Sequence, residues 1–122
     1  MFFKKKERPT APQITDDNFH TLVMETEQGV LLDFYADWCG PCKILGPVID
    51  ELSLEFKDRA LIGKINVDKN PRLSELFKIK SIPTLLFVKN KKVLERLSGL
   101  VPKPNLQEMI EDLIRYSFEE EE

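Results

Sequence analysis

The sequence predicts an α/β fold, in which helices cover both faces of a mixed sheet. Stretches with the length of strands alternate with stretches of helical periodicity, an order typical of βαβ units and a parallel sheet. Two of the strand-like stretches, residues 30–36 and 84–88, are apolar almost throughout, as in strands that are buried on both faces. A short polar turn joins the last two strand-like stretches, so we expect antiparallel pairing at one side of the sheet.

The first half of the chain alternates helix, strand and helix. Thr15 can cap a helix whose apolar residues repeat at helical spacing, and Gly29 follows as a stop. Residues 30–36 then form a strand that is apolar except for Asp33. In the next helix we expect a kink at Pro47, because proline removes a hydrogen bond and crowds the preceding turn. One face of this helix is apolar and carries Leu45, Val48, Ile49, Leu52 and Phe56.

The second half continues with a strand at residues 61–67 and a short helix that starts at Pro71, since proline suits the first helical position. Residues 84–88 and 93–98 form a hairpin of two strands. Asn105, with a glutamate three residues later, resembles a capping box at the start of a last helix. That helix has an apolar stripe made of Leu106, Met109, Ile110, Leu113 and Ile114.

The only two cysteines of the chain, Cys39 and Cys42, stand between a predicted strand and a predicted helix. If Pro41 lies in the first helical turn, Cys39 meets free backbone N–H groups and the positive end of the helix dipole. Both favour the thiolate, so we expect Cys39 to be the nucleophile. Cys42 lies on the same face of the first turn and is the natural resolving thiol. Two cysteines are too few for a closed structural zinc site, and we expect no metal.

Asp33 is an unusual residue for a strand that is apolar on both faces. A buried carboxylate must be paired, hydrated or neutral, and burial raises its pKa. A carboxyl group tuned in this way can act as a general acid or base near neutral pH. Lys64, in the next predicted strand, interrupts an apolar stretch and is a plausible partner. The pattern alone equally allows a surface-facing Asp33 at the edge of the sheet.

Three single residues near these elements have both a structural and a functional interpretation. Trp38 precedes Cys39 and could shield the thiolate and offer a flat apolar contact to a substrate. Pro83 precedes a strand, and by itself such a proline is expected to be trans. His20, the only histidine, is expected to be a solvated side chain, which argues against a Cys–His hydrolase.

These stretches together resemble the thioredoxin family. The resemblance runs from about Thr15 to Ile114 and is carried by VLLDFYADWCGPCK, KINVDKNP, SIPTLLF and LSGL. It implies a three-layer α/β/α fold with a central five-stranded mixed sheet and four flanking helices. Two departures from the family pattern are Tyr35, where many members have tryptophan, and Ser81, where glycine is common. In the hairpin turn, Asn90 or Lys91 must accept the unusual backbone conformation.

The resemblance also implies a role for each matching residue. Cys39 would be the attacking cysteine, Cys42 the resolving cysteine, Asp33 the group that assists deprotonation of the resolving thiol, and Lys64 its neighbour. It implies a cis peptide bond before Pro83, against the expectation from that residue alone. The implied substrate-binding residues are Trp38, Gly40, Pro41, Val67, Ile82, Pro83 and Gly99.

The activity implied is that of a general protein-disulfide reductase that cycles between dithiol and disulfide. It needs no bound cofactor, and its electrons would come from NADPH through thioredoxin reductase. Its partners would be that reductase and disulfide-containing protein substrates. One alternative is a disulfide oxidase or isomerase in an oxidising compartment, and another is an interaction module of the same fold whose dithiol is not essential.

The chain has the length of one domain, and its composition excludes several other functions. We assign residues 1–12 to a flexible basic N-terminal extension, 13–118 to the thioredoxin domain and 119–122 to an acidic tail, with a short strand near Ile14. The net charge of −3 gives no indication of the basic surface that nucleic-acid binding requires. No run approaches the ~20 apolar residues of a membrane span, so we expect no membrane association. We expect a monomer in the cytoplasm, or in the periplasm or medium if a leader was removed.

Overall fold

The computed structural model describes residues 9–118, and the lysine run and the glutamate run of the two predicted tails lie outside this range. Its sheet has the strand order β2-β1-β3-β4. β1 pairs in parallel with β2 and antiparallel with β3, which pairs antiparallel with β4. The mixed sheet predicted from the sequence is therefore confirmed. The strands are β1 (Gly29–Tyr35), β2 (Ala60–Asn66), β3 (Thr84–Lys89) and β4 (Lys92–Ser98).

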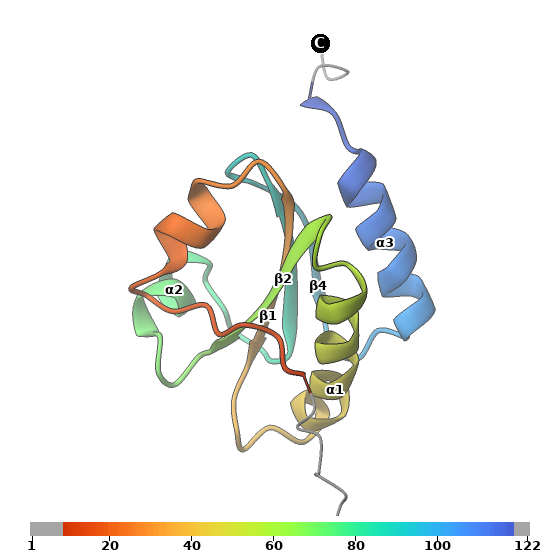
Figure 1. Cartoon of the computed structure of the whole chain (residues 1–122). Helices are drawn as coiled ribbons and strands as arrows, with labels where there is room; N and C mark the ends of the chain where they lie inside the picture. The colour runs from red at the N-terminus through yellow and green to blue at the C-terminus, as the bar shows by residue number, and fades with distance from the viewer. Residues whose placement is uncertain (1–8, 119–122) are drawn as a thin grey trace, which may run out of the picture.

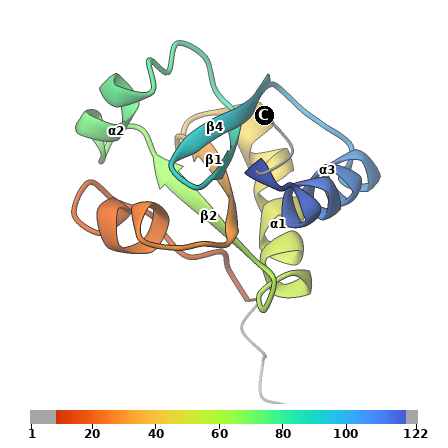
Figure 2. The ribbon, with the colours of Figure 1, turned by 90° about the horizontal axis from the view of Figure 1, so that it is seen from above.

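Helical segments cover both faces of the sheet, as predicted. α1 and α3 lie side by side on one face, and η1, a short π-helical turn, lies with α2 on the other (Figures 1 and 2). The three layers thus form the expected α/β/α arrangement. The segments are η1 (His20–Met24), α1 (Gly40–Glu55), α2 (Pro71–Leu76) and α3 (Lys103–Arg115).

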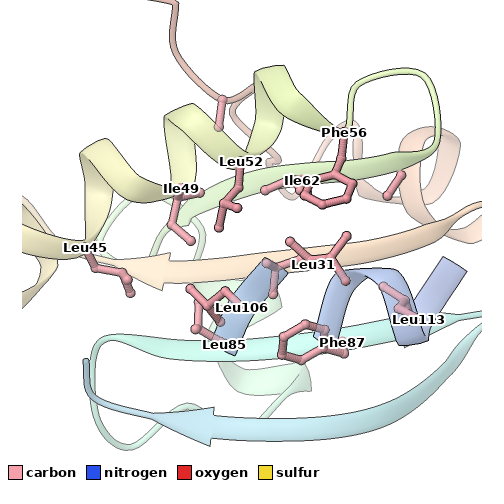
Figure 3. Packing of buried hydrophobic residues seen from close by; sticks show 13 residues of the cluster. Leu31, Leu45, Ile49, Leu52, Phe56, Ile62, Leu85, Phe87, Leu106 and Leu113 are labelled. Atoms are coloured by element: carbon pink, nitrogen blue, oxygen red, sulfur yellow. The ribbon is translucent and has the colours of Figure 1, made fainter. Parts of the chain in front are cut away.

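β1 is buried on both faces, and its residues alternate between two cores. Leu31 belongs to the core under α1 and α3, where Leu45, Ile49 and Leu52 of α1 point toward the sheet (Figure 3). Its neighbours Val30, Leu32 and Phe34 belong to the core under η1 and α2. This alternation directs Asp33 to the same face as Leu31, the face that α1 covers.

The fifth strand implied by the family resemblance is reduced to a single bridge in the described residues. Gln13 forms an isolated parallel bridge with Lys64 of β2. On either side of it, the N–H of Ile14 donates to the carbonyl of Lys64 at 2.7 Å, and the N–H of Lys64 donates to the carbonyl of Pro12 at 2.9 Å. Pro12 has no N–H with which to extend the ladder. The sheet of the described residues accordingly has four strands.

The N-terminal segment packs against the domain before residue 13. Ala11 is only 3% exposed and belongs to the core under α1. Its N–H donates to Asp50 of α1 at 2.8 Å. Residues 11 and 12, which were assigned to the flexible extension, are therefore part of the packed structure.

Two local predictions at chain turns have different outcomes. Asn90 and Lys91 both have positive φ, 50° and 67°, so the turn between β3 and β4 has the unusual backbone that was expected there. The cap predicted at Asn105 is wrong, because α3 begins two residues earlier, at Lys103. The N–H of Asn105 bonds to the carbonyl of Pro102, which occupies the cap position.

Candidate active site

Cys39 is the residue that caps the N-terminus of α1. Its backbone is extended, with φ −88° and ψ 115°, and Pro41 follows in the first turn. The backbone N–H of Cys42 donates to Sγ of Cys39 at 3.2 Å. The expected position of Cys39 at a helix start is therefore confirmed. An N–H that points at the sulfur, together with the helix dipole, stabilises negative charge on it.

The two cysteines are joined by a disulfide bond, with 5.3 Å between their Cα atoms. This distance lies within the range of about 4.4–6.8 Å that a disulfide needs. Both residues are buried together with Ala36, and the half-buried Val67 and Ile82 pack against them. The disulfide thus lies at the carboxyl end of β1, in contact with the apolar side chains of Val67 and Ile82.

The segment before β3 approaches the disulfide from the side. The peptide bond between Ile82 and Pro83 is cis, as the family resemblance implied, so the trans bond expected from the residue alone is wrong. The carbonyl oxygen of Ile82 lies 3.8 Å from Sγ of Cys39. Gly99, at φ 85°, donates its N–H to the carbonyl of Pro83 at 2.9 Å. The structure therefore brings Ile82 to the side of Cys39, with Pro83 next in the chain and Gly99 bonded to Pro83.

Trp38 extends away from the protein next to the disulfide. It is 70% exposed, and its Nε1–H donates to Asp68 at 2.9 Å. Together with Val67 and Ile82 it lines a shallow pocket of about 170 Å³. The exposed Gly40 and Pro41 belong to the first turn of α1 beside it. Val67 and Ile82 thus pack against the cysteines, and Trp38, Gly40 and Pro41 are next to them in the chain.

Asp68 is a residue of this site that the sequence analysis missed. Its own N–H donates to the side chain of Asn66 at 2.9 Å, which fixes the turn after β2. The sequence could have indicated Asp68, because it is an acidic residue in the turn after β2. β1 and β2 are parallel, so the turns that follow them lie at the same edge of the sheet.

Asp33 is fully buried, so the buried alternative left open by the sequence is confirmed. Neither of its carboxylate oxygens has a hydrogen-bond partner in residues 9–118. Burial raises the pKa of Asp33 to about 7, while Lys64 acts to lower this pKa and Asp50 to raise it. Asp33 and Cys42 line the same cavity of about 280 Å³.

Lys64 lies opposite Asp33 in the pairing of β1 with β2, but it is not bonded to it. Its Nζ instead forms a salt bridge with Oδ1 of Asp50 at 2.8 Å. Lys64 is thus the neighbour of Asp33 in the sheet, as the resemblance implied, but its salt-bridge partner is Asp50. Asp50 was not predicted as a site residue, although it follows Cys42 by eight residues and Gly46 by four, which places all three on one side of the helix.

His20 is 77% exposed and lies 3.5 Å from Glu25, as expected for a solvated side chain. Within residues 9–118, no group of three or more His, Cys, Asp or Glu side chains could hold a metal ion. Across the same range, the helices are too short or too polar to cross a membrane.

The class of protein follows from the chemistry that this site permits. Two sulfur atoms that can be bonded or separate exchange two electrons with other thiols and disulfides. The described structure places this pair at the start of a helix, and a buried carboxyl group lines the same cavity as Cys42. The protein is thus a thiol–disulfide oxidoreductase.

Comparison with known proteins identifies the family. The thioredoxin family model matches residues 10–112. The chain is 42% identical over 102 residues to a thioredoxin of Chlorobaculum thiosulfatiphilum, which covers 84% of this chain and 94% of that protein. It is 40% identical over 104 residues to an M-type chloroplastic thioredoxin of Chlamydomonas reinhardtii, covering 85% of this chain and 74% of that protein. The chain belongs to the thioredoxin family.

Membership of this family defines the activity as protein-disulfide reduction, and it does not favour the oxidase, the isomerase or the redox-independent interaction module. Proteins of the family work without a bound cofactor, act on disulfide substrates and are themselves reduced by a reductase.

Proposed function

We propose that Cys39 is the nucleophile and Cys42 the resolving thiol of this reductase. The Cys39 thiolate attacks one sulfur of a substrate disulfide, forms a mixed disulfide and releases the other substrate sulfur as a thiolate. Cys42, once deprotonated, attacks Sγ of Cys39 and expels the second substrate thiolate. The substrate gains two electrons, and the protein is left with the Cys39–Cys42 disulfide. The observation that carries this assignment is the N–H of Cys42 directed at Sγ of Cys39, at 3.2 Å.

Asp33 is the proton acceptor for Cys42 in this proposal, directly or through water. Two features support the role: its carboxylate oxygens have no other partner within residues 9–118, and it shares a cavity with Cys42. With a pKa of about 7, the Asp33 carboxyl group is present in both its protonated and its ionised form near neutral pH, so it can accept and return a proton. Lys64, on the opposite strand, contributes positive charge to the same cavity.

The substrate binds over the apolar residues around Cys39. Trp38 offers an exposed flat surface, and the carbonyl of Ile82 lies close enough to Cys39 to pair with the backbone of an extended substrate segment. Cis-Pro83 holds that carbonyl beside the sulfur. The rest of the surface comes from Gly40, Pro41, Val67 and Gly99.

The electrons reach the disulfide from NADPH through a flavin-containing thioredoxin reductase. The Gly-Pro pair between the cysteines resembles the reducing members of the family, so we place the cycle in a reducing compartment, the cytoplasm. There the protein works as a monomer on disulfide-containing proteins.

Trapping of substrates tests the assignment of the two cysteines. Cys42→Ser should accumulate mixed disulfides through Cys39 in a cell extract, because the second step is blocked. Cys39→Ser is the matched control and should accumulate few or none. Non-reducing electrophoresis measures both, and equal yields from the two variants would refute the assignment of the nucleophile.

A further inference from the structure

The cavity below the disulfide contains Lys64 as the cationic member of a salt bridge. We propose that its partner, Asp50, is a positioning residue for the resolving step. It holds the ammonium group of Lys64 away from Asp33 and thereby keeps Asp33 able to accept a proton from Cys42. This inference rests on the proposed function of Asp33 and adds a second carboxylate that controls it.

Asp50 is fixed by contacts with two other segments of the chain. Its Oδ1 lies 2.8 Å from Nζ of Lys64 in β2, and it accepts the backbone N–H of Ala11 at 2.8 Å. The side chains of Asp50 and Lys64 are only 11% and 14% exposed. Water therefore screens this salt bridge less than it screens a surface pair, and its geometry can determine where the positive charge stays.

The position of Asp50 on α1 connects it with the chemistry. Cys42, Gly46 and Asp50 follow one another at intervals of four residues and line the cavity that also contains Asp33. A Cβ atom added to Gly46 would come within 3.5 Å of Nζ of Lys64, so the ammonium group lies across this side of the helix. The ammonium group that Asp50 binds therefore lies next to the stretch of α1 between Cys42 and Asp50.

Several titratable or charged groups share the cavity with Asp33, and they come from every element packed around it. They are Tyr35 of β1, Asp37 of the following loop, Cys42, Lys43 and Asp50 of α1, and Lys64 of β2. Among them, Lys64 and Asp50 act on the pKa of Asp33 in opposite directions, Lys64 lowering it and Asp50 raising it.

The loss of the Asp50 charge would favour the ionised form of Asp33 in two ways. The carboxylate that disfavours ionisation of Asp33 would be gone, and Lys64 would be free to approach Asp33, its neighbour in the strand pairing. An ionised Asp33 beside an ammonium group is a weaker base. The second step should then slow near neutral pH, while the first step, which depends on Cys39, should change little.

The test compares Asp50→Asn with Glu51→Gln. The asparagine keeps an oxygen that can accept the N–H of Ala11, so the substitution removes charge with little change of shape. Glu51, the next residue of α1, also forms a salt bridge, at 3.2 Å to Lys103, but its side chain is 60% exposed. It is the matched control for loss of one carboxylate from the same helix.

Two measurements are made on each variant. Carbon NMR of the Asp33 carboxyl group, in the oxidised protein, gives its titration midpoint directly. We expect the midpoint to fall by about one pH unit or more in Asp50→Asn, the effect of an opposite charge brought close, and to stay unchanged in Glu51→Gln. Stopped-flow reaction of the reduced protein with a chromophoric aromatic disulfide gives two phases of thiolate release. The second phase reports the attack of Cys42, and its pH midpoint should fall with that of Asp33.

Stopped-flow measurements on proteins that also carry Asp33→Asn distinguish the proposed role of Asp50 from the proposed role of Asp33. There the additional Asp50→Asn substitution should leave the pH dependence of the second phase unchanged. An unaltered Asp33 midpoint in Asp50→Asn would overturn the role of Asp50. A second phase that does not respond to Asp33→Asn would instead overturn the role of Asp33, and the NMR titration would still decide whether Asp50 controls its charge. If Asp50→Asn does not fold, Asp50→Ser removes the same charge and is judged by the same criteria.

Discussion

Replacing Asp33 by asparagine isolates what one buried carboxyl group contributes to the pH dependence of stability. The pKa of Asp33 is about 7 in the folded protein, against an ordinary value of 3.8. This difference, at about 1.36 kcal/mol for each pH unit, corresponds to about 4 kcal/mol. The free energy is large because the side chain is fully buried and lacks a hydrogen-bond partner in the described residues.

The sign follows from which state binds the proton. Between the two pKa values the unfolded chain has released the proton of Asp33 while the folded protein still holds it, so the free energy of unfolding falls as the pH rises. The favourable contribution is complete below pH 3.8 and lost once the pH exceeds about 7. At about pH 5 some 1.7 kcal/mol has already been lost, so about 2.7 kcal/mol remains to be lost by about pH 9.

Urea unfolding of the oxidised protein between about pH 5 and about pH 9 measures this effect. The stability of the wild type relative to Asp33→Asn should decline across the range by about 2.7 kcal/mol. A buried amide without partners adds a cost to the variant, but that cost does not depend on pH. Asp58→Asn, which removes an exposed carboxylate that does not line the cavity of Asp33, should run parallel to the wild type. Parallel curves for the wild type and Asp33→Asn would refute the account of a buried carboxyl group that ionises near neutrality.

Two further predictions concern contacts that hold the fold together. Gly63→Ala should lower the free energy of unfolding by about 1–3 kcal/mol, because the new Cβ would lie 2.6 Å from Cγ1 of Ile14. Gly40→Ala, whose Cβ meets nothing within 4 Å, is the control, and equal urea midpoints for the two variants would contradict the reasoning. Lys89→Met removes three hydrogen bonds to backbone carbonyls at the end of α3, all between 2.8 and 2.9 Å. It should cost about 1.5–3 kcal/mol and speed amide exchange in the last turn of α3, and unchanged exchange there would argue against this anchor.

Much of the fold could be predicted from the sequence, because local patterns and tertiary packing agree along most of the chain. The apolar stretches at residues 30–36 and 84–88 became β1 and β3, within a residue or so of their predicted limits. Pro71 marked the start of α2 correctly. Where local patterns gave competing signals, prediction failed. Pro102 supplied the start of α3 although Asn105 had the better capping side chain.

The position of the dithiol could also be predicted, but the partners of the charged residues could not. The pattern showed that Asp33 and Lys64 interrupt apolar strands, and they do lie opposite each other. Which carboxylate binds Lys64 depends on how α1 is rotated over the sheet, and this rotation turns Asp50 toward the ammonium group. The cis bond before Pro83 was likewise beyond the local sequence, and only the family pattern indicated it.

The last strand in the sheet order has a consequence for the protein at high concentration. β4 has mostly exposed side chains, among them Lys92, Glu95 and Arg96, and its register with β3 shifts near Val88. An outer strand with unpaired backbone groups invites other chains to add to the sheet, but charged side chains and an irregular register oppose such addition. These features of β4 therefore disfavour the addition of further strands at this edge of the sheet.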